Sequence, residues 1–334
     1  MPSASAPLSD RPADRPSLGI ALILAGMLAI SINDVLIKAL SDRYPLHQAV
    51  FVRSGVGILF SLTILRFEGG LRALRVQRPA LHLARGLLIA VSNLAFFAAV
   101  AVLPLAEATA LFFVAPLFLT LLSIPLLGER VGAVRLAAVA VGFAGVLIMQ
   151  RPWAGTDSLE VSRVVLLLPV LAAATYALTN ILTRKLGADT QASAMAVWLQ
   201  GTLLTLSILM YLTAGDGRFA AGASNDSLVF LLRAWTWPET TRDYLLFAGL
   251  GLNSALVAYA LSAAYKVAQA ATIAPYEYAG LPLAVFWGWV IFGTLPGLEV
   301  WIGIALILGA GLTVFLRERR LGRGPRGRRL ARRF

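Results

Sequence analysis

Residues 80–127 read ALHLARGLLIAVSNLAFFAAVAVLPLAEATALFFVAPLFLTLLSIPLL, and Arg85 and Glu107 are their only residues of the Asp, Glu, Lys and Arg types. A helix needs about 20 consecutive, mainly apolar residues to cross a bilayer. The stretch is long enough for two such helices, and Pro104 divides it because proline cannot continue a helix without losing a hydrogen bond. We therefore expect two membrane-spanning helices joined by a short turn.

The rest of the chain continues this pattern. Of its 334 residues, 58% are hydrophobic and 14% are charged, whereas soluble domains are closer to half apolar and a quarter charged. The surplus apolar surface must face lipid, which favours an all-α membrane protein over a soluble enzyme. A sliding window predicts ten membrane-spanning helices, at residues 17–39, 46–66, 80–102, 106–127, 131–149, 162–183, 191–213, 243–265, 270–292 and 298–316.

The basic residues predict the orientation of these helices. With the N-terminus inside, 20 of the 29 Lys and Arg residues fall in cytoplasmic segments and six in external ones. This asymmetry predicts cytoplasmic termini in a bacterial inner membrane. Residues 1–16, with four prolines, are expected to form a disordered cytoplasmic tail. Nine arginines in the basic cytoplasmic tail, 317–334, are interpreted as contacts to anionic lipid headgroups rather than to nucleic acid.

Several kinds of chemistry are excluded by composition. The chain has no cysteine and only two histidines, which argues against a disulfide framework, a thiol nucleophile and a histidine-rich metal centre. No Gly-Lys pair occurs, so a Walker motif is absent. The glycines of 322–327 match a dinucleotide fingerprint only formally, because they follow a membrane helix rather than a strand. We expect no catalytic residue, no metal and no cofactor.

The two halves of the chain resemble each other. At an offset of 147 residues, three polar residues recur: Asn33, Lys38 and Asp42 fall on Asn180, Lys185 and Asp189. Further matches follow at an offset of 162, such as Ala98 with Ala260, and at 166, where Pro116 falls on Pro282 and Gly145 on Gly311.

These matches define two repeats, at 17–149 and 162–316, of five helices each. An odd number of helices means that the second repeat runs inverted in the membrane. Inverted repeats are common in secondary transporters, whose substrate site lies near the midplane between the halves. The expected fold is thus ten transmembrane helices in two inverted five-helix repeats.

Short motifs carry a family resemblance over residues 17–316. Ala106-Glu107-Ala108-Thr109-Ala110 leading to Pro116, and Gly128-Glu129-Arg130, resemble the EamA type of the drug/metabolite transporter (DMT) superfamily. In the second half, Gly293-Thr294-Leu295 stands where Gly-Glu-Arg would recur.

Three further motifs resemble one branch of this superfamily. They are Asn33-Asp34-Val35 with Lys38, Arg78-Pro79-x-x-His82 with Arg85, and Ala274-Pro275-Tyr276-x-Tyr278. The branch contains the rickettsial S-adenosylmethionine uptake transporters, and riboflavin permeases are similar through the same regions.

The resemblance implies a permease that carries a small organic metabolite by alternating access. It points first to uptake of S-adenosylmethionine, with riboflavin uptake or export of amino acids or other metabolites as alternatives. Two other classes stay open: a membrane-embedded enzyme, for which the sequence offers no nucleophile or metal cluster, and a non-transporting scaffold. Fold alone does not decide the cargo.

Ionisable residues within membrane helices are costly and are candidates for function by default. Asp34 and Arg53 are expected at similar depth on adjacent helices, where they would form a structural ion pair, with Lys38 one turn after Asp34. Asp34 is also a candidate counter-charge for a cationic cargo. The competing interpretation of each such residue is a purely structural role.

The remaining candidates lie in helices 3, 8 and 9. Glu277, between Tyr276 and Tyr278 and after Pro275, is expected to face a central cavity and to contribute to cargo binding or proton coupling. Arg85 is the alternative partner of Glu277 or of a cargo carboxylate. Two amides, Asn93 and Asn253, are candidates for hydrogen bonds to cargo, although polar residues also join helices.

Overall fold

The computed structural model describes residues 15–68, 70–129, 131–153, 162–186, 192–223, 225–268 and 270–322. Within these ranges every regular element is a helix. The first half contains α1 (Pro16–Leu40), α2 (Leu46–Glu68), the short 3-10 helix η1 (Leu71–Leu74), α3 (Pro79–Val100), α4 (Leu105–Phe112), α5 (Ala115–Leu127) and α6 (Ala133–Gln150).

The second half is built in the same order. It contains α7 (Arg163–Leu186), α8 (Ala192–Ala214), α9 (Asp226–Leu232), α10 (Thr241–Val267), α11 (Ala270–Ile273), the 3-10 helix η4 (Ala274–Ala279), α12 (Gly280–Phe292) and α13 (Leu298–Gly322). Nine stretches within the described ranges are helical, long and apolar enough to span a membrane. The tenth predicted span, 270–292, is present as the succession α11, η4 and α12, so the ten-helix prediction is confirmed.

Two of the predicted membrane spans are interrupted within their length. The span 106–127 breaks at residues 113–114, between α4 and α5, and the span 270–292 changes to a 3-10 helix at η4. Proline explains both interruptions, because Pro116 stands at the start of α5 and Pro275 at the start of η4. Broken helices at matching positions of two inverted repeats are typical of transporter binding sites.

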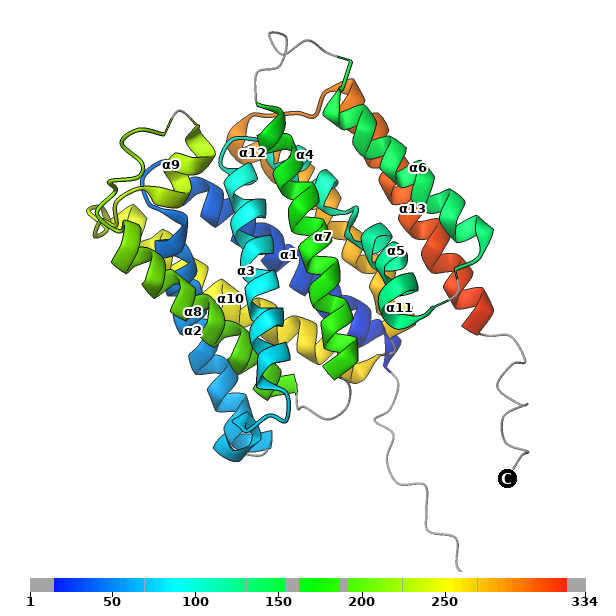
Figure 1. Cartoon of the computed structure of the whole chain (residues 1–334), viewed down its shortest axis with the longest axis horizontal. Helices are drawn as coiled ribbons and strands as arrows, with labels where there is room; N and C mark the ends of the chain where they lie inside the picture. The colour runs from blue at the N-terminus through cyan, green and yellow to red at the C-terminus, as the bar shows by residue number, and fades with distance from the viewer. Residues whose placement is uncertain are drawn as a thin grey trace, which may run out of the picture.

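The helices pair across the two halves (Figure 1): α1 with α10, α3 with α7, α2 with α8, α4 with α12, and α6 with α13. Exchanging the halves turns the α1–α10 pair into the α7–α3 pair and maps the α2–α8 and α6–α13 pairs onto themselves. The α4–α12 pair joins the two corresponding spans, 106–127 and 270–292. This is the packing expected of an inverted repeat. The repeat boundaries themselves, 17–149 and 162–316, stay predictions.

Small residues allow some of these pairs to approach closely. A Cβ added to Gly145 of α6 would lie 3.0 Å from the carbonyl oxygen of Gly303 on α13, and a Cβ on Gly303 would lie 3.0 Å from that of Gly145. Membrane helices associate through such close contacts, since lipid provides no hydrophobic drive between them. On the outside of the bundle, apolar side chains such as Leu59, Leu212 and Leu252 are 66–71% exposed, as expected of surfaces that face lipid.

The segment between α8 and α10 closes one end of the bundle, which we call the α9 end; the opposite end, where α1 begins and α13 finishes, is the terminal end (Figure 1). In α9, Phe230 is buried, and Ser227 Oγ donates to the carbonyl of Ala98 over 2.7 Å. Gln48 Nε2 of α2 donates to the carbonyl of Thr236, also over 2.7 Å. The segment is therefore packed onto the bundle.

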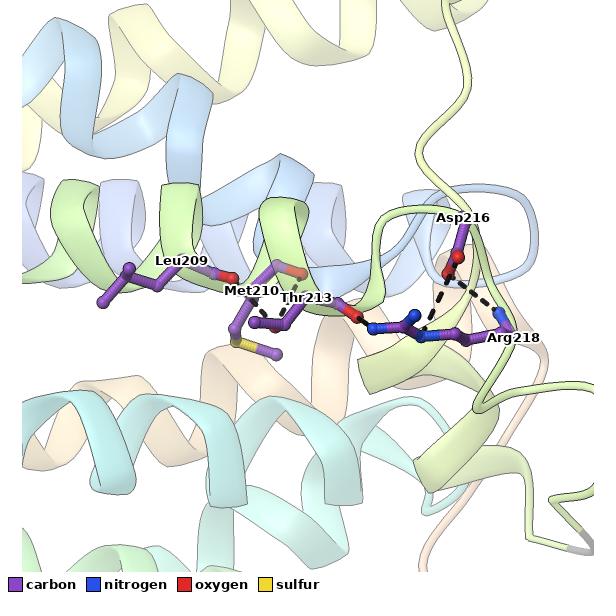
Figure 2. A network of polar contacts seen from close by, with 5 residues as sticks. All are labelled: Leu209, Met210, Thr213, Asp216 and Arg218. Carbon is purple, nitrogen blue, oxygen red and sulfur yellow. Dashed lines mark hydrogen bonds and ion pairs between the residues drawn. The ribbon is translucent and has the colours of Figure 1, made fainter.

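Arg218 lies four residues after the end of α8, at this same end of the bundle. Its Nη2 donates to the carbonyl of Thr213 over 2.6 Å, and its Nε lies 3.8 Å from Asp216 Oδ2 (Figure 2). The last carbonyls of a helix carry partial negative charge and are stabilised by a cation. Arg218 thus caps α8.

Candidate functional site

A cavity of about 260 Å³ lies between α5, α7, η4 and α13. It runs from the two helix breaks toward the terminal end of the bundle. Its lining consists of aromatic, small polar and charged side chains: Phe113, Pro116, Leu119, Thr120, Ser123, Glu129, Arg135, Arg184, Glu277, Tyr278, Gly311, Val314 and Phe315. A concave site with apolar walls and a few converging polar groups is the usual form of a small-molecule site.

Two aromatic rings meet where the broken helices meet. The ring of Phe113, at the end of α4, and the ring of Tyr278, in η4, have centroids 5.6 Å apart and planes tilted by 34°. Phe315 of α13 adds a third ring to the lining. The helix breaks therefore provide aromatic surfaces on which a flat ring system can stack.

Two glycines allow these rings to occupy their positions. A Cβ on Gly311 would lie 2.0 Å from the hydroxyl oxygen of Tyr278, and a Cβ on Gly280 would lie 3.4 Å from the ring of Phe113 and 2.7 Å from Met27. A side chain at residue 311 would displace the tyrosine. Gly311 is thus a steric requirement of the site.

Four charged residues line the same cavity, and their formal charges balance. Arg184 Nη1 lies 3.4 Å from Glu129 Oε1, and these two side chains are 53% and 41% exposed. Glu277 and Arg135 supply one further charge of each sign. An exposed ion pair contributes little to stability, about 0–1 kcal/mol. The Glu129–Arg184 pair can therefore open and close at low cost.

The two helix breaks differ by four residues. The repeats match at an offset of 162 as far as Ala108 and Ala270, and at 166 from Pro116 and Pro282 onward. The four extra residues of the second repeat thus fall between Ala270 and Pro282, the stretch that contains η4. Glu277 and Tyr278 lie in this longer stretch, and both line the cavity.

The predicted residues of helix 9 divide between cavity and surface. Glu277 and Tyr278 line the cavity, whereas Tyr276 is 38% exposed and lies outside the lining. Arg85 does not line it either: its Nε donates to Thr183 Oγ1 over 2.8 Å and its Nη1 to the carbonyl of Met195 over 3.2 Å. The arginines that share the cavity with Glu277 are Arg135 and Arg184.

The two candidate amides bind protein groups. Asn253 Nδ2 donates to the carbonyl of Ala29 over 2.6 Å and joins α10 to α1. Asn93 Oδ1 accepts from Arg53 Nη2 over 2.6 Å, while its Nδ2 donates to the carbonyl of Ile89. Neither amide lines the cavity. Their roles in cargo binding stay predictions without support from this geometry.

The ion pair expected between Asp34 of α1 and Arg53 of α2 is not a direct contact. Asp34 and Arg53 interact electrostatically, but they are not among the direct ion pairs within 4 Å that the described residues form. Arg53 instead binds Asn93 and lies 5.5 Å from the ring centroid of Phe97. Lys38 Nζ donates instead to the carbonyls of Val100 and Leu103, at and just beyond the end of α3. The coupling of Asp34 and Arg53 remains a prediction.

Sequence reasoning missed most of the cavity lining. Phe113, Phe315 and Gly311 carry no distinguishing signal in an apolar helix. In the sequence, Arg184 is one of the basic residues of the cytoplasmic loops that predict the topology, and nothing else distinguishes it. Glu129 belongs to the Gly-Glu-Arg motif, and because it lines the cavity, the motif borders the site.

Comparison with known proteins assigns this architecture to a family. The model of the EamA-like transporter family matches residues 17–151. A riboflavin transporter of Rhizobium johnstonii is 34% identical over 306 residues, which cover 91% of this chain and 92% of that protein. The chain belongs to the EamA-like transporter family. It is a multi-pass membrane protein that transports small metabolites.

The other relatives are named for more than one cargo. A riboflavin transporter of Vibrio cholerae is 30% identical over 88% of this chain and 91% of its own length. An S-adenosylmethionine uptake transporter of Rickettsia prowazekii is 25% identical over 90% and 94%. A protein of known crystal structure, 20% identical, superposes with a TM-score of 0.60 over 91% of this chain and 99% of its own, so the two chains share a fold.

Proposed function

We propose that this EamA-like transporter carries riboflavin across the bacterial inner membrane into the cytoplasm. The observation that carries the proposal is the aromatic pair of Phe113 and Tyr278, which lines the cavity at the junction of the two broken helices. Riboflavin has a flat three-ring system, and stacking of such a ring on an aromatic side chain contributes about 1–3 kcal/mol. Relatives named riboflavin transporters share more identity with this chain than the S-adenosylmethionine uptake transporters.

The charges of the cavity support a neutral cargo. Riboflavin carries no net charge at neutral pH, and its ribityl chain offers hydroxyl groups to both acids and bases. Glu129 and Glu277 would suit a cation, but Arg135 and Arg184 line the same cavity and offset them. A cargo with net charge would leave part of that set uncompensated, at a cost in a low-dielectric site.

S-adenosylmethionine is the second candidate. Its sulfonium and ammonium groups could pair with the carboxylates of Glu129 and Glu277, and its adenine could stack on the same rings. Its net positive charge is the point on which the two cargoes differ. Competition between them therefore tests the proposal.

The test is a binding measurement on purified protein. Riboflavin fluorescence should be quenched on binding, and S-adenosylmethionine should fail to displace it at equal concentration. Tyr278→Ala should weaken binding at least about fivefold, the low end of the stacking contribution. Tyr276→Ala is the matched control, because this neighbouring tyrosine lies outside the cavity lining and its loss should leave binding unchanged.

Displacement of riboflavin by S-adenosylmethionine at equal or lower concentration would instead favour the second candidate. Equal effects of the Tyr278 and Tyr276 substitutions would contradict the assigned cavity.

A further inference from the structure

Lys38 ties three helices together at the α9 end. Its Nζ donates to the carbonyl of Val100 over 2.5 Å and to the carbonyl of Leu103 over 2.8 Å, and it lies 5.4 Å from the ring centroid of Phe292. Val100 is the last residue of α3, and Phe292 is the last residue of α12. The final carbonyls of a helix lack intrahelical donors and carry partial negative charge. Lys38 of α1 therefore caps α3 next to the end of α12.

This cap coincides with a closed end of the bundle. There α1 packs against α3, and Arg233, just after α9, donates to the carbonyls of Ser41 and Asp42 at the end of α1. Hydrogen bonds from a charged donor are roughly twice as strong as neutral ones. The charged hydrogen bonds of Lys38 thus hold α1 against the end of α3.

The repeat puts a second lysine at the corresponding point of the opposite end. Lys185, near the end of α7, matches Lys38 at the offset of 147, and α10 matches α3. Lys185 is exposed and forms no side-chain hydrogen bond or ion pair with the described residues. The packing of α1 on α3 has no counterpart of similar extent between α7 and α10. Among the described residues, Lys185 therefore makes no contact at the terminal end that corresponds to the one Lys38 makes at the α9 end.

We propose that Lys38 and Lys185 are alternating latches of the transport cycle. In the state described here, Lys38 holds the α9 end closed and Lys185 is released beside the open cavity. In inverted-repeat transporters, access alternates as one unit rocks against the other around a fixed site. When the terminal end closes, Lys185 donates to carbonyls in the last turn of α10, and Lys38 leaves α3. The inference rests on the transport function but not on the identity of the cargo.

One difference between the repeats fixes which carbonyls Lys185 takes. Pro104 prevents α3 from continuing, whereas Lys266 occupies the matching position at the offset of 162, and α10 runs on to Val267. The carbonyls without intrahelical donors are therefore those of the last turn of α10, which contains the position matched to Leu103 but not the position matched to Val100.

The absence of native cysteine permits a direct test. Leu119→Cys introduces one thiol into the cavity lining. The full-length protein is placed in right-side-out and inside-out vesicles without cargo, and a membrane-impermeant maleimide labels the thiol from one side at a time. The ratio of the two labelling rates measures which end is open.

The two latch variants should move this ratio in opposite directions. Lys38→Met should shift it about tenfold toward labelling from the α9 end, the low end for loss of a charged hydrogen bond. Lys185→Met should shift it toward labelling from the terminal end. Arg218→Met, which removes a charge that caps α8 (Figure 2), should leave the ratio unchanged.

Shifts in the same direction, or no shift in either variant, would overturn the proposal. If Lys38→Met fails to fold, Lys185→Met decides alone, because its exposed side chain is not needed for packing in the present state; an unchanged ratio in that variant then refutes the latches. The labelling uses no cargo, so a failure to bind riboflavin would leave its outcome intact.

Discussion

Replacing Gly311 with alanine should weaken riboflavin binding without unfolding the protein. The added Cβ would lie 2.0 Å from the hydroxyl oxygen of Tyr278 and 2.8 Å from its Cζ. Heavy atoms pack best at a separation of about 3.5 Å, so the hydroxyl end of the ring must move by about 1.5 Å. This movement disturbs the ring pair with Phe113. We expect a loss of affinity of about tenfold, or about 1.4 kcal/mol, within the range for one stacking contact.

The assay is the fluorescence titration of riboflavin with purified protein, and the same helix provides the control. Gly309 precedes Gly311 by two residues on α13, and a Cβ at Gly309 would meet no atom within 4 Å. Both substitutions gain the same helix propensity, about 1 kcal/mol. A difference in affinity between Gly311→Ala and Gly309→Ala therefore reports the displacement of Tyr278.

A second substitution should restore part of the loss. In Gly311→Ala combined with Tyr278→Phe, the hydroxyl that makes the 2.0 Å contact is gone, and the ring can return most of the way. The reasoning is refuted if Gly311→Ala binds riboflavin as tightly as Gly309→Ala. It is also refuted if the double variant binds no better than Gly311→Ala alone.

Three other predictions follow from the same structure. Asp34→Asn or Arg53→Gln alone should reduce the yield of folded protein more than the double variant, because an uncompensated charge at bilayer depth costs about 2.5–3.5 kcal/mol; additive losses would exclude coupling. Tyr44→Phe removes a 2.9 Å hydrogen bond to Asp243 and should lower the unfolding free energy by about 1.5–3 kcal/mol. Burial and the Asp243 carboxylate raise the pKa of Tyr44, so this contribution is complete below the ordinary tyrosine pKa of about 10; thermal unfolding should lose it only as pH rises through the higher folded value. Phosphatase and fluorescent-protein fusions should report cytoplasmic termini and an external loop 214–242, and phosphatase activity from a fusion after α13 would contradict that topology.

The helices were predictable because the membrane imposes a simple rule on sequence. About 20 apolar residues are needed per span, and prolines and glycines mark most of the ends. What hydropathy cannot reveal is a break inside an apolar stretch. Pro116 and Pro275 were visible, but whether a proline bends a helix or interrupts it depends on the neighbouring helices that satisfy the freed backbone groups.

The site was less predictable than the fold. Glu277 and Tyr278 were predictable as candidates because a charge beside aromatic rings is unusual within a membrane helix, and both line the cavity. Tyr276 shares their sequence context but points elsewhere, which only the three-dimensional course of η4 decides. Arg85 and Asn253 bind groups on neighbouring helices, so their predicted roles in cargo binding gain no support from the structure and stay predictions.

Transport itself tests the central claim most directly. Purified protein reconstituted into liposomes should accumulate riboflavin with saturable kinetics; Tyr278→Ala should reduce this uptake, whereas Tyr276→Ala should not. Liposomes containing correctly folded protein that take up no more riboflavin than empty ones, while they do take up S-adenosylmethionine, would contradict the proposed cargo.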